Sequence, residues 1–298
     1  EELRGDLTFL LESKDKRFVH WYERRGRGLY LQATPIDVAP ILTERLFDSV
    51  ETIVLTSATL AVGGTFDFVK SRLGIRRAEE LILDSHFDYG NQALLYLPRT
   101  MPDPRADEFG PKVAEEVRAL LQISEGRALV LTSSYRALSE LKMALQGNVP
   151  YEVLVQGEAP RERLLERFRS EVSSVLLATS TFWQGVDIPG EALSLLVIDK
   201  LPFSAPGDPL YEARCEAVSK AGGDWFADFA LPMAMLQLRQ GFGRLIRSHA
   251  DRGVVAILDP RLRTKAYGRA FLAALPHAPM AEDRVAVASF FGTSVAAA

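Results

Sequence analysis

A glutamine and two arginines recur at helical spacing towards the end of the chain. In the run QGFGRLIR, Gln240, Arg244 and Arg247 stand at positions i, i+4 and i+7. On an α-helix this spacing brings the three side chains to one face. Two guanidiniums and an amide that project together suit a polyphosphate, because guanidiniums match phosphate oxygens and offset charge that develops during phosphoryl transfer. A solvated basic stripe on a surface helix would give the same pattern.

A second polar stretch covers residues 178–190, ATSTFWQGVDIPG, and follows an apolar run. Its hydroxyls and loop N–H groups can hold the backbone phosphates of a nucleic acid, and an aromatic ring can stack on a base. Asp187 could accept a hydrogen bond from a ribose or orient the two arginines. The alternative is an ordinary loop whose phenylalanine and tryptophan pack in the core.

Two shorter hydroxyl-rich stretches also follow apolar runs. Residues 56–59 read TSAT and residues 132–135 read TSSY. At a helix start, hydroxyls and N–H groups form a natural phosphate site. Each stretch alone is a weak signal, because such turns are common after strands and the second suits a simple helix cap equally well.

The elements that must position these residues form a regular series. From residue 92 onward, apolar runs alternate with segments of helical periodicity, which predicts an α/β fold with a parallel sheet and helices on both faces. Ligands of such sheets bind beyond the carboxyl ends of the strands, where the loops hold Thr132, Gln156, Thr179 and Asp259. The predicted strands are 93–96, 128–131, 152–155, 174–178, 195–198 and 254–258, and the predicted helices are 111–121, 135–145, 161–169, 209–220 and 225–248.

The first part of the chain has a different pattern. Residues 17–23 and 28–32 predict a β-hairpin, residues 37–47 a helix, and residues 52–55 a short buried parallel strand. We place a boundary near the segment 84–90, which gives a small β-rich region at 1–88 and a main domain at 89–298.

Composition excludes several classes of protein. The 298 residues carry 35 Lys and Arg against 39 Asp and Glu, a net charge of −4, so a basic surface must be local. Residues 239–269 supply one, with seven arginines and one lysine against two aspartates. Cys215 is the only cysteine and the four histidines lack ligand spacing, so we expect no disulfide and no metal site. With no apolar run long enough for a membrane span, we expect a cytoplasmic protein.

In their order and spacing, the four polar stretches resemble the motor motifs of superfamily 2 helicases. The resemblance is closest to the DinG-type branch, the bacterial relatives of XPD helicases, and it covers nearly the whole chain. Residues 56–59 are similar to motif III, residues 129–135 to motif IV, residues 180–190 to motif V, and residues 240–247 to motif VI.

The resemblance implies a RecA-like fold and ATP-driven movement along single-stranded DNA with 5′-to-3′ polarity, typical of DNA repair. It implies that Arg244 and Arg247 are arginine fingers and that Gln240 senses the γ-phosphate. Gln184 stands where the family usually has glutamate, which leaves its role open. By resemblance, Gly185, Asp187 and Gly243 bind the nucleotide, Ser133, Ser134, Tyr135, Thr181 and Trp183 contact DNA, and Thr56, Ser57, Ala58 and Thr59 couple hydrolysis to movement.

Two motor motifs are missing. No glycine is followed by lysine, so the Walker A phosphate loop is absent, and so is the metal-binding Asp-Glu-Ala-His motif. We therefore expect residues 1–88 to be the end of a first motor domain with its linker, and residues 89–298 to be the second RecA-like domain.

This division predicts that ATP with Mg²⁺ is shared with the absent first motor domain, the chain's partner beside single-stranded DNA. The chain alone should be inactive, and an iron–sulfur cluster could belong only to the absent part. The alternative is a non-catalytic nucleic-acid-binding or regulatory module. A metabolic α/β enzyme is a weaker third, since no nucleophile–base pair or dinucleotide fingerprint is found.

Overall fold

The computed structural model describes residues 1–179, 182, 188, 190–204 and 207–293. The chain forms two compact units, which are described separately below. The smaller consists of Glu1–Ile82 and Phe203–Ala234, and the larger of Leu83–Pro202 and Met235–Ala298. Residues 203–234 thus pack with the N-terminal unit, which no pattern in the sequence indicates. The boundary at residue 88 between two motor domains stays a prediction.

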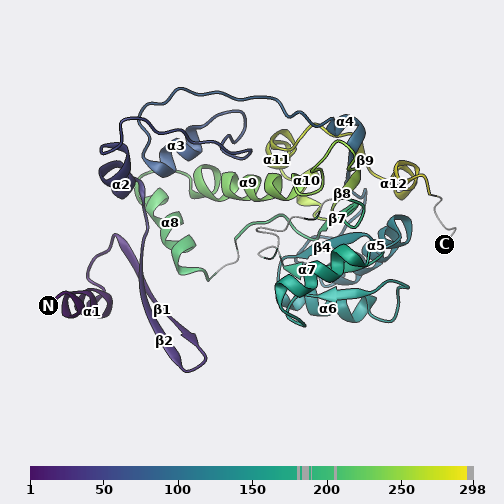
Figure 1. The fold of residues 1–298 in the computed structure, drawn as a ribbon, viewed down its shortest axis with the longest axis horizontal. Helices are drawn as coiled ribbons and strands as arrows, with labels where there is room; N and C mark the ends of the chain where they lie inside the picture. Colours follow the sequence, from purple (N-terminus) through teal and green to yellow (C-terminus); the bar gives the residue numbers. More distant parts are fainter. Residues whose placement is uncertain (180–181, 183–187, 189, 205–206, 294–298) are drawn as a thin grey trace. The chain divides into compact units, whose positions relative to one another are not determined.

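A seven-stranded parallel sheet is the centre of the larger unit (Figure 1). Its strand order is β5-β6-β4-β7-β8-β3-β9, so β4 and β7 lie in the middle, as their apolar sequences require. The predicted strands are confirmed to within one or two residues, and a short edge strand is added. The strands are β3 (Ala93–Tyr96), β4 (Ala128–Thr132), β5 (Val153–Val155), β6 (Val175–Thr179), β7 (Leu195–Ile198), β8 (Gly253–Ile257) and β9 (Met280–Ala281).

Helices cover both faces of this sheet. Helices α5 (Phe109–Ser124), α6 (Tyr135–Leu145) and α12 (Arg284–Phe291) share one apolar core with alternate strand residues, among them Val130 and Val197. The connection from β5 to β6 runs along the sheet in the opposite direction to the connection from β3 to β4. Because such crossovers are right-handed, α7 (Arg161–Ser170) covers the other face. The predicted two-sided parallel sheet is confirmed.

A buried charge network links helix α5 to strand β3 and to helix α12. Glu116 of α5 is only 3% exposed and accepts hydrogen bonds from the Tyr96 hydroxyl at 2.6 Å and from Arg284 Nη2 at 2.5 Å. Burial, and then the Glu116 carboxylate, raise the pKa of Tyr96, so this hydroxyl stays a donor. The paired charges fix α12 against α5.

The remaining helices of the larger unit are short or connect the strands. They are α4 (Tyr89–Gln92), α10 (Arg261–Thr264), α11 (Gly268–Ala274) and the end of α9 (Leu231–Phe242). In the part of the chain that the structure describes, no helix has the length and apolar character needed to cross a bilayer.

The smaller unit combines one antiparallel hairpin with helices. Strands β1 (Phe18–Arg25) and β2 (Gly28–Pro35) confirm the predicted hairpin, and the predicted helix at 37–47 is present as α2 (Ala39–Leu42) followed by the π-helix η1 (Thr43–Phe47). The base of the hairpin contacts α8, whose Arg214 donates to the carbonyl of Ile36 at 3.1 Å. The other helices of this unit are α1 (Glu2–Glu12), α3 (Asp67–Leu73), α8 (Pro209–Lys220) and η2 (Phe226–Ala230).

The predicted strand at residues 52–55 is wrong. These residues have no regular secondary structure, and Val54 is 82% exposed. A buried parallel strand needs neighbours that satisfy its backbone and cover its side chains, and the described residues place none beside this segment.

Candidate functional site

Polar side chains gather at the carboxyl ends of the central strands in the larger unit. Ser133 and Ser134 follow β4, and Asp199 follows β7, the strand that pairs with β4. The Ser133 N–H and hydroxyl both donate to Asp199 Oδ2 at 3.0 Å, and the Lys200 N–H donates to Asp199 Oδ1 at 2.6 Å. Asp199 is 3% exposed, so its carboxylate does not face solvent and instead fixes the position of Ser133.

Ser134 has a local structural role. It is the N-cap of α6, and its hydroxyl accepts a hydrogen bond from the Ala137 N–H at 3.1 Å. The helix-cap interpretation therefore holds for this side chain. Tyr135, the next residue, is 65% exposed at the first turn of α6, where it is accessible to a ligand.

One glutamine links the ends of three strands. Gln156 follows β5, and its Oε1 accepts hydrogen bonds from the N–H of Thr179 at 2.7 Å and from its hydroxyl at 3.0 Å. Its Nε2 donates to the Tyr135 hydroxyl at 3.0 Å. Sequence reasoning noted Gln156 only as part of a polar loop, because the bridge depends on strand order. The amide fixes Tyr135 relative to the last residue of β6.

A second buried carboxylate organises the ends of β7 and β8. Asp259 Oδ2 accepts from the Leu201 N–H at 2.8 Å, and Arg261 forms a bidentate pair with the same carboxylate, Nε to Oδ1 at 2.9 Å and Nη2 to Oδ2 at 2.6 Å. An arginine of the basic segment 239–269 is therefore paired with one of the two aspartates of that segment. Lys200 extends across this edge, with Nζ 2.9 Å from the Pro104 carbonyl and 5.0 Å from the ring centroid of Phe109.

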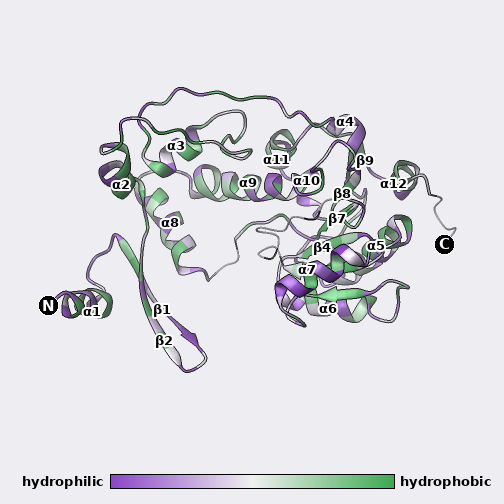
Figure 2. Ribbon diagram, viewed as in Figure 1, coloured by the Kyte–Doolittle hydropathy of each residue, from purple (hydrophilic) through white to green (hydrophobic). Residues whose placement is uncertain are grey.

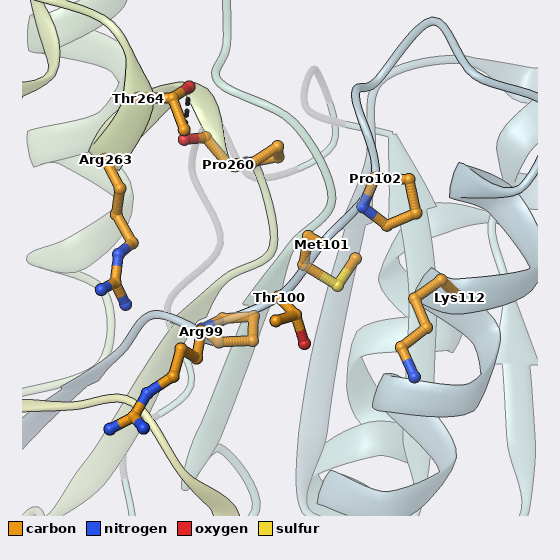
Figure 3. Close-up of a pocket in the computed structure, with 9 residues that line it drawn as sticks. Arg99, Thr100, Met101, Pro102, Lys112, Pro260, Arg263 and Thr264 are labelled. Atoms are coloured by element: carbon orange, nitrogen blue, oxygen red, sulfur yellow. Dashed lines mark hydrogen bonds between the residues drawn. The ribbon is translucent and has the colours of Figure 1, made fainter.

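A hollow of about 480 Å³ lies farther along the same edge, between the loop after β3 and helix α10 (Figure 3). Arg99, Lys112 and Arg263 line it together with prolines and Met101. Arg99 and Arg263 both pair with Glu282, and Lys112 pairs with Glu115. In these pairs two carboxylates face three cations, because Arg99 and Arg263 share Glu282, so the positive charge of the hollow is only partly offset.

The arginine-rich stretch lies at the opposite ends of the strands. Helix α9 ends at Phe242 and β8 begins at Gly253, so residues 243–252 stand at the amino end of β8. Here Asp251 Oδ2 accepts from the N–H groups of Arg247 and Ser248, both at 2.7 Å, and Oδ1 accepts from the Gly190 N–H at 3.2 Å. We call residues 243–248 the arginine turn. The Asp251 carboxylate therefore holds both this turn and Gly190, the last residue of the stretch 178–190.

A glutamine before β3 ties down this end of the sheet as well. Gln92 Nε2 donates to the carbonyls of Ser248 and Asp251, each at 2.9 Å. Burial raises the pKa of Tyr89, and a hydrogen bond with Ser85 and the charges of Arg239 and Arg247 oppose this rise. The backbone of the turn is thus held by hydrogen bonds from two side chains, Asp251 and Gln92.

The predicted shared helical face of the arginine motif is wrong. Gln240 is on α9, but Arg244 and Arg247 follow its last residue in a turn in which the Arg244 N–H donates to the Gly241 carbonyl at 2.9 Å. The two glycines weaken the helix, and Asp251 captures the N–H of Arg247 before the helix can continue. The three side chains still come from one connected segment.

Comparison with known proteins assigns this fold. A family model described as helicase C-terminal domain matches residues 117–278, more than half of the chain. The chain belongs to the helicase C-terminal domain family. The predicted resemblance to DinG-type and XPD helicases is confirmed, and so is the RecA-like fold.

Individual relatives agree with the helicase C-terminal domain. ATP-dependent DNA helicase YoaA of Haemophilus influenzae is 41% identical over 290 residues, which are 97% of this chain and 45% of that protein. ATP-dependent helicase DinG of Mycobacterium tuberculosis is 39% identical over 270 residues, 88% of this chain and 40% of that protein. The chain therefore spans less than half the length of these curated relatives.

Solved structures agree on the fold. The structure XPD_APO superposes with a TM-score of 0.64 at 19% identity and covers 94% of this chain and 57% of its own. At this identity the likeness shows the fold alone.

In the helicase C-terminal domain of this chain, the predicted site residues divide into groups. Ser133, Ser134 and Tyr135 lie together at the carboxyl ends of the strands, whereas Gln240, Gly243, Arg244 and Arg247 belong to the segment at the amino end of β8. Thr179, which precedes the motif V stretch, and Gly190, its last residue, have hydrogen bonds at these two opposite ends. The predicted residues Thr181, Trp183, Gly185 and Asp187, and also Gln184, lie outside the described residues.

The motif III stretch belongs to the smaller unit. Thr56, Ser57 and Ala58 are exposed, and the hydroxyls of Ser57 and Thr59 are 3.2 Å apart. Their predicted coupling role stays a prediction.

We expect the buried carboxylate of Asp199 to give the larger unit a pH-dependent stability. Burial raises the pKa of Asp199, although donors from Ser133 and Lys200 oppose this rise. Because the pKa is higher in the folded state than the unfolded value of about 3.9, ionisation favours unfolding. The free energies of unfolding of wild type and of Asp199→Asn are measured with urea. The wild-type value minus the variant value should fall as the pH rises above about 4, the unfolded pKa, and through the raised folded pKa. The fall should be about 1.4 kcal/mol for each tenfold difference in acid dissociation constant between the folded and unfolded states. A difference that stays constant or grows with pH would contradict the assignment.

Proposed function

We propose that this chain is the second motor half of an ATP-dependent DNA helicase. Its hydroxyl cluster at the carboxyl ends of the strands would contact single-stranded DNA, and its arginine turn would act on ATP. The observation that carries the proposal is the arrangement of polar groups at both ends of one parallel sheet. Asp251 joins the arginine turn to Gly190, the last residue of the motif V stretch, and Thr179, which precedes that stretch, is bonded to Gln156 beside Tyr135.

This arrangement supports a division of labour between the two ends. Ser133 and Tyr135 offer a hydroxyl and a ring to a nucleic-acid backbone and its bases, together with Ser134, Thr181 and Trp183. Arg244 and Arg247 would stabilise charge on the transferred phosphoryl group, with Gln240 at the γ-phosphate and Gly185, Asp187 and Gly243 beside the nucleotide. Thr179, just before motif V, is bonded at one end of the sheet and Gly190, its last residue, at the other, so motif V connects the two sites along the chain.

The proposal requires a first motor domain that supplies the phosphate loop and holds Mg²⁺ with the ATP. The relatives YoaA and DinG are named ATP-dependent helicases, and the chain matches less than half of each. We propose that the parent protein acts in the cytoplasm on single-stranded DNA. Its 5′-to-3′ polarity rests on the family resemblance, and Thr56, Ser57, Ala58 and Thr59 would couple hydrolysis to movement.

The test is ATP hydrolysis by this chain alone and by the chain joined to its own upstream coding sequence. The isolated chain should show no turnover with or without single-stranded DNA, and the joined protein should show turnover that DNA stimulates. Hydrolysis by the isolated chain would refute the division of labour. Upstream coding sequence without Gly-Lys-Thr and Asp-Glu-Ala-His would instead support a non-catalytic nucleic-acid-binding module.

A further inference from the structure

The β1–β2 hairpin of the smaller unit leaves large apolar side chains in water. Tyr22 is 70% exposed, Leu29 64%, Tyr30 49% and Trp21 37%. The register of the ribbon, residues 18–35, puts Trp21 and Tyr30 on one face and Tyr22 and Leu29 on the other. Exposed apolar side chains close to one another on one face mark an interaction surface. No motif in the sequence accounts for them.

Trp21 and Tyr30 share a face of the ribbon with Arg25. Trp21 Nε1 donates to the Thr34 hydroxyl at 3.1 Å, and the Arg25 guanidinium lies 5.3 Å from the Tyr30 ring centroid. Such diagonal cross-strand contacts occur only between side chains on the same side of the ribbon. Trp21, Arg25 and Tyr30 therefore form one aromatic and cationic surface, already ordered by their mutual contacts.

The other end of the ribbon is anchored. On the opposite face, Phe18 and His20 pack against Phe9 of α1, with ring centroids 5.2 Å from it. The turn end projects away from α2 and α8, the helices beside the base of the ribbon in the same unit (Figure 1). A tight turn at Gly26, with φ 59°, keeps the ribbon narrow.

The ribbon and its approach carry a local positive charge. Residues 14–27 contain six lysines and arginines against two carboxylates, in a chain whose net charge is −4. Three of the cations, Arg24, Arg25 and Arg27, flank the turn, where Figure 2 shows the end of β1 in the hydrophilic colour. Glu23 pairs with Arg25 at 2.7 Å and offsets only one of these charges.

We propose that the turn end of this ribbon is a binding surface for single-stranded nucleic acid. Bases would stack on Tyr30 and Trp21, and Arg24, Arg25 and Arg27 would meet the phosphates. Exposed rings favour a single strand over a duplex, because a ribbon that reads a duplex groove needs polar side chains at base edges. The choice of ligand rests on the proposed function, to which this surface adds a contact outside the motor motifs.

The test measures binding of the 298-residue chain to a labelled oligothymidylate of about 20 nucleotides, by fluorescence anisotropy from about 50 to 200 mM salt. Changing Arg24, Arg25 and Arg27 to Gln should weaken binding at least tenfold at low salt and reduce the salt slope by about 2. Trp21→Ser with Tyr30→Ser should weaken binding about tenfold without changing the slope. A matched control changes three exposed arginines of the same unit, Arg45, Arg76 and Arg77, to Gln and should bind like wild type.

The outcomes separate this surface from the motor site. Loss of binding in Ser133→Ala/Tyr135→Ala, with ribbon variants like the control, would overturn the ribbon and keep the proposed function. The reverse result would keep the ribbon and refute the assigned motor contacts. Tighter binding to a duplex of equal length would overturn the stacking surface. If the wild-type chain does not bind at low salt, the ribbon proposal fails, while ATP hydrolysis by the joined protein still decides the proposed function.

Discussion

Replacing Arg247 with alanine in the joined protein should lower DNA-stimulated ATP hydrolysis about a thousandfold, because an arginine that stabilises the transferred phosphoryl group contributes at least that much. The substitution should leave the turn in place, since Asp251 holds residue 247 through its main-chain N–H. Binding of single-stranded DNA should therefore change little. Steady-state turnover with saturating DNA measures the first effect, and anisotropy measures the second.

Arg252 provides a matched control for this prediction. It lies in the same basic segment, but its guanidinium stacks 4.2 Å from the ring centroid of Phe290. Arg252→Ala should keep turnover within about threefold of wild type, because the lost contact is a stacking interaction away from the turn. Arg244→Ala should resemble Arg247→Ala. Near-normal turnover in both motif VI variants would remove the arginine-finger assignment.

The second large effect is expected at Asp251. Asp251→Ala leaves the N–H groups of Arg247, Ser248 and Gly190 without their acceptor. Hydrogen bonds to a charged group are worth about 1.5–3 kcal/mol each, and water replaces part of them, so we expect the larger unit to lose about 3 kcal/mol of unfolding free energy. Turnover in the joined protein should also fall sharply, because the turn that presents Arg247 is no longer fixed. Urea denaturation and steady-state kinetics measure the two effects.

Asp283, an aspartate that caps a helix, is a control that separates the role of Asp251 in positioning Arg247 from its effect on the stability of the fold. Asp283 caps α12 by accepting the Ala286 N–H at 2.9 Å, far along the sequence from the arginine turn. Asp283→Ala should cost about 1 kcal/mol and leave turnover unchanged. Asp251→Asn keeps one carbonyl acceptor and should recover part of the activity. If Asp251→Ala reduces turnover no more than Asp283→Ala does at equal folded fraction, then Asp251 only stabilises the fold.

Local sequence patterns were enough to predict most of the strands and helices of the larger unit. The apolar runs of β4, β6 and β7 are flanked by segments of helical periodicity, and both signals act over a few residues, so the strands and the helices α6 and α7 are correctly predicted. The hairpin is also correct, since β-branched and aromatic residues flank a glycine-containing turn. Where the helix prediction failed, two glycines and the carboxylate of Asp251 decided the outcome. Leu245 and Ile246 continue the apolar period of α9, yet the helix ends at Phe242.

The sequence by itself determined the family, the alternation of strands and helices, and the segments that carry polar chemistry, because residue types and their spacing along the chain contain that information. Only the tertiary structure decided which of these segments meet. Ser133 and Asp199 are 66 residues apart, and Gly190 and Asp251 are 61 apart, yet strand order brings each pair within hydrogen-bonding distance. The same strand directions separate the hydroxyl cluster from the arginine turn. Local sequence decides which residues form a strand, but which strands become neighbours depends on the whole sheet.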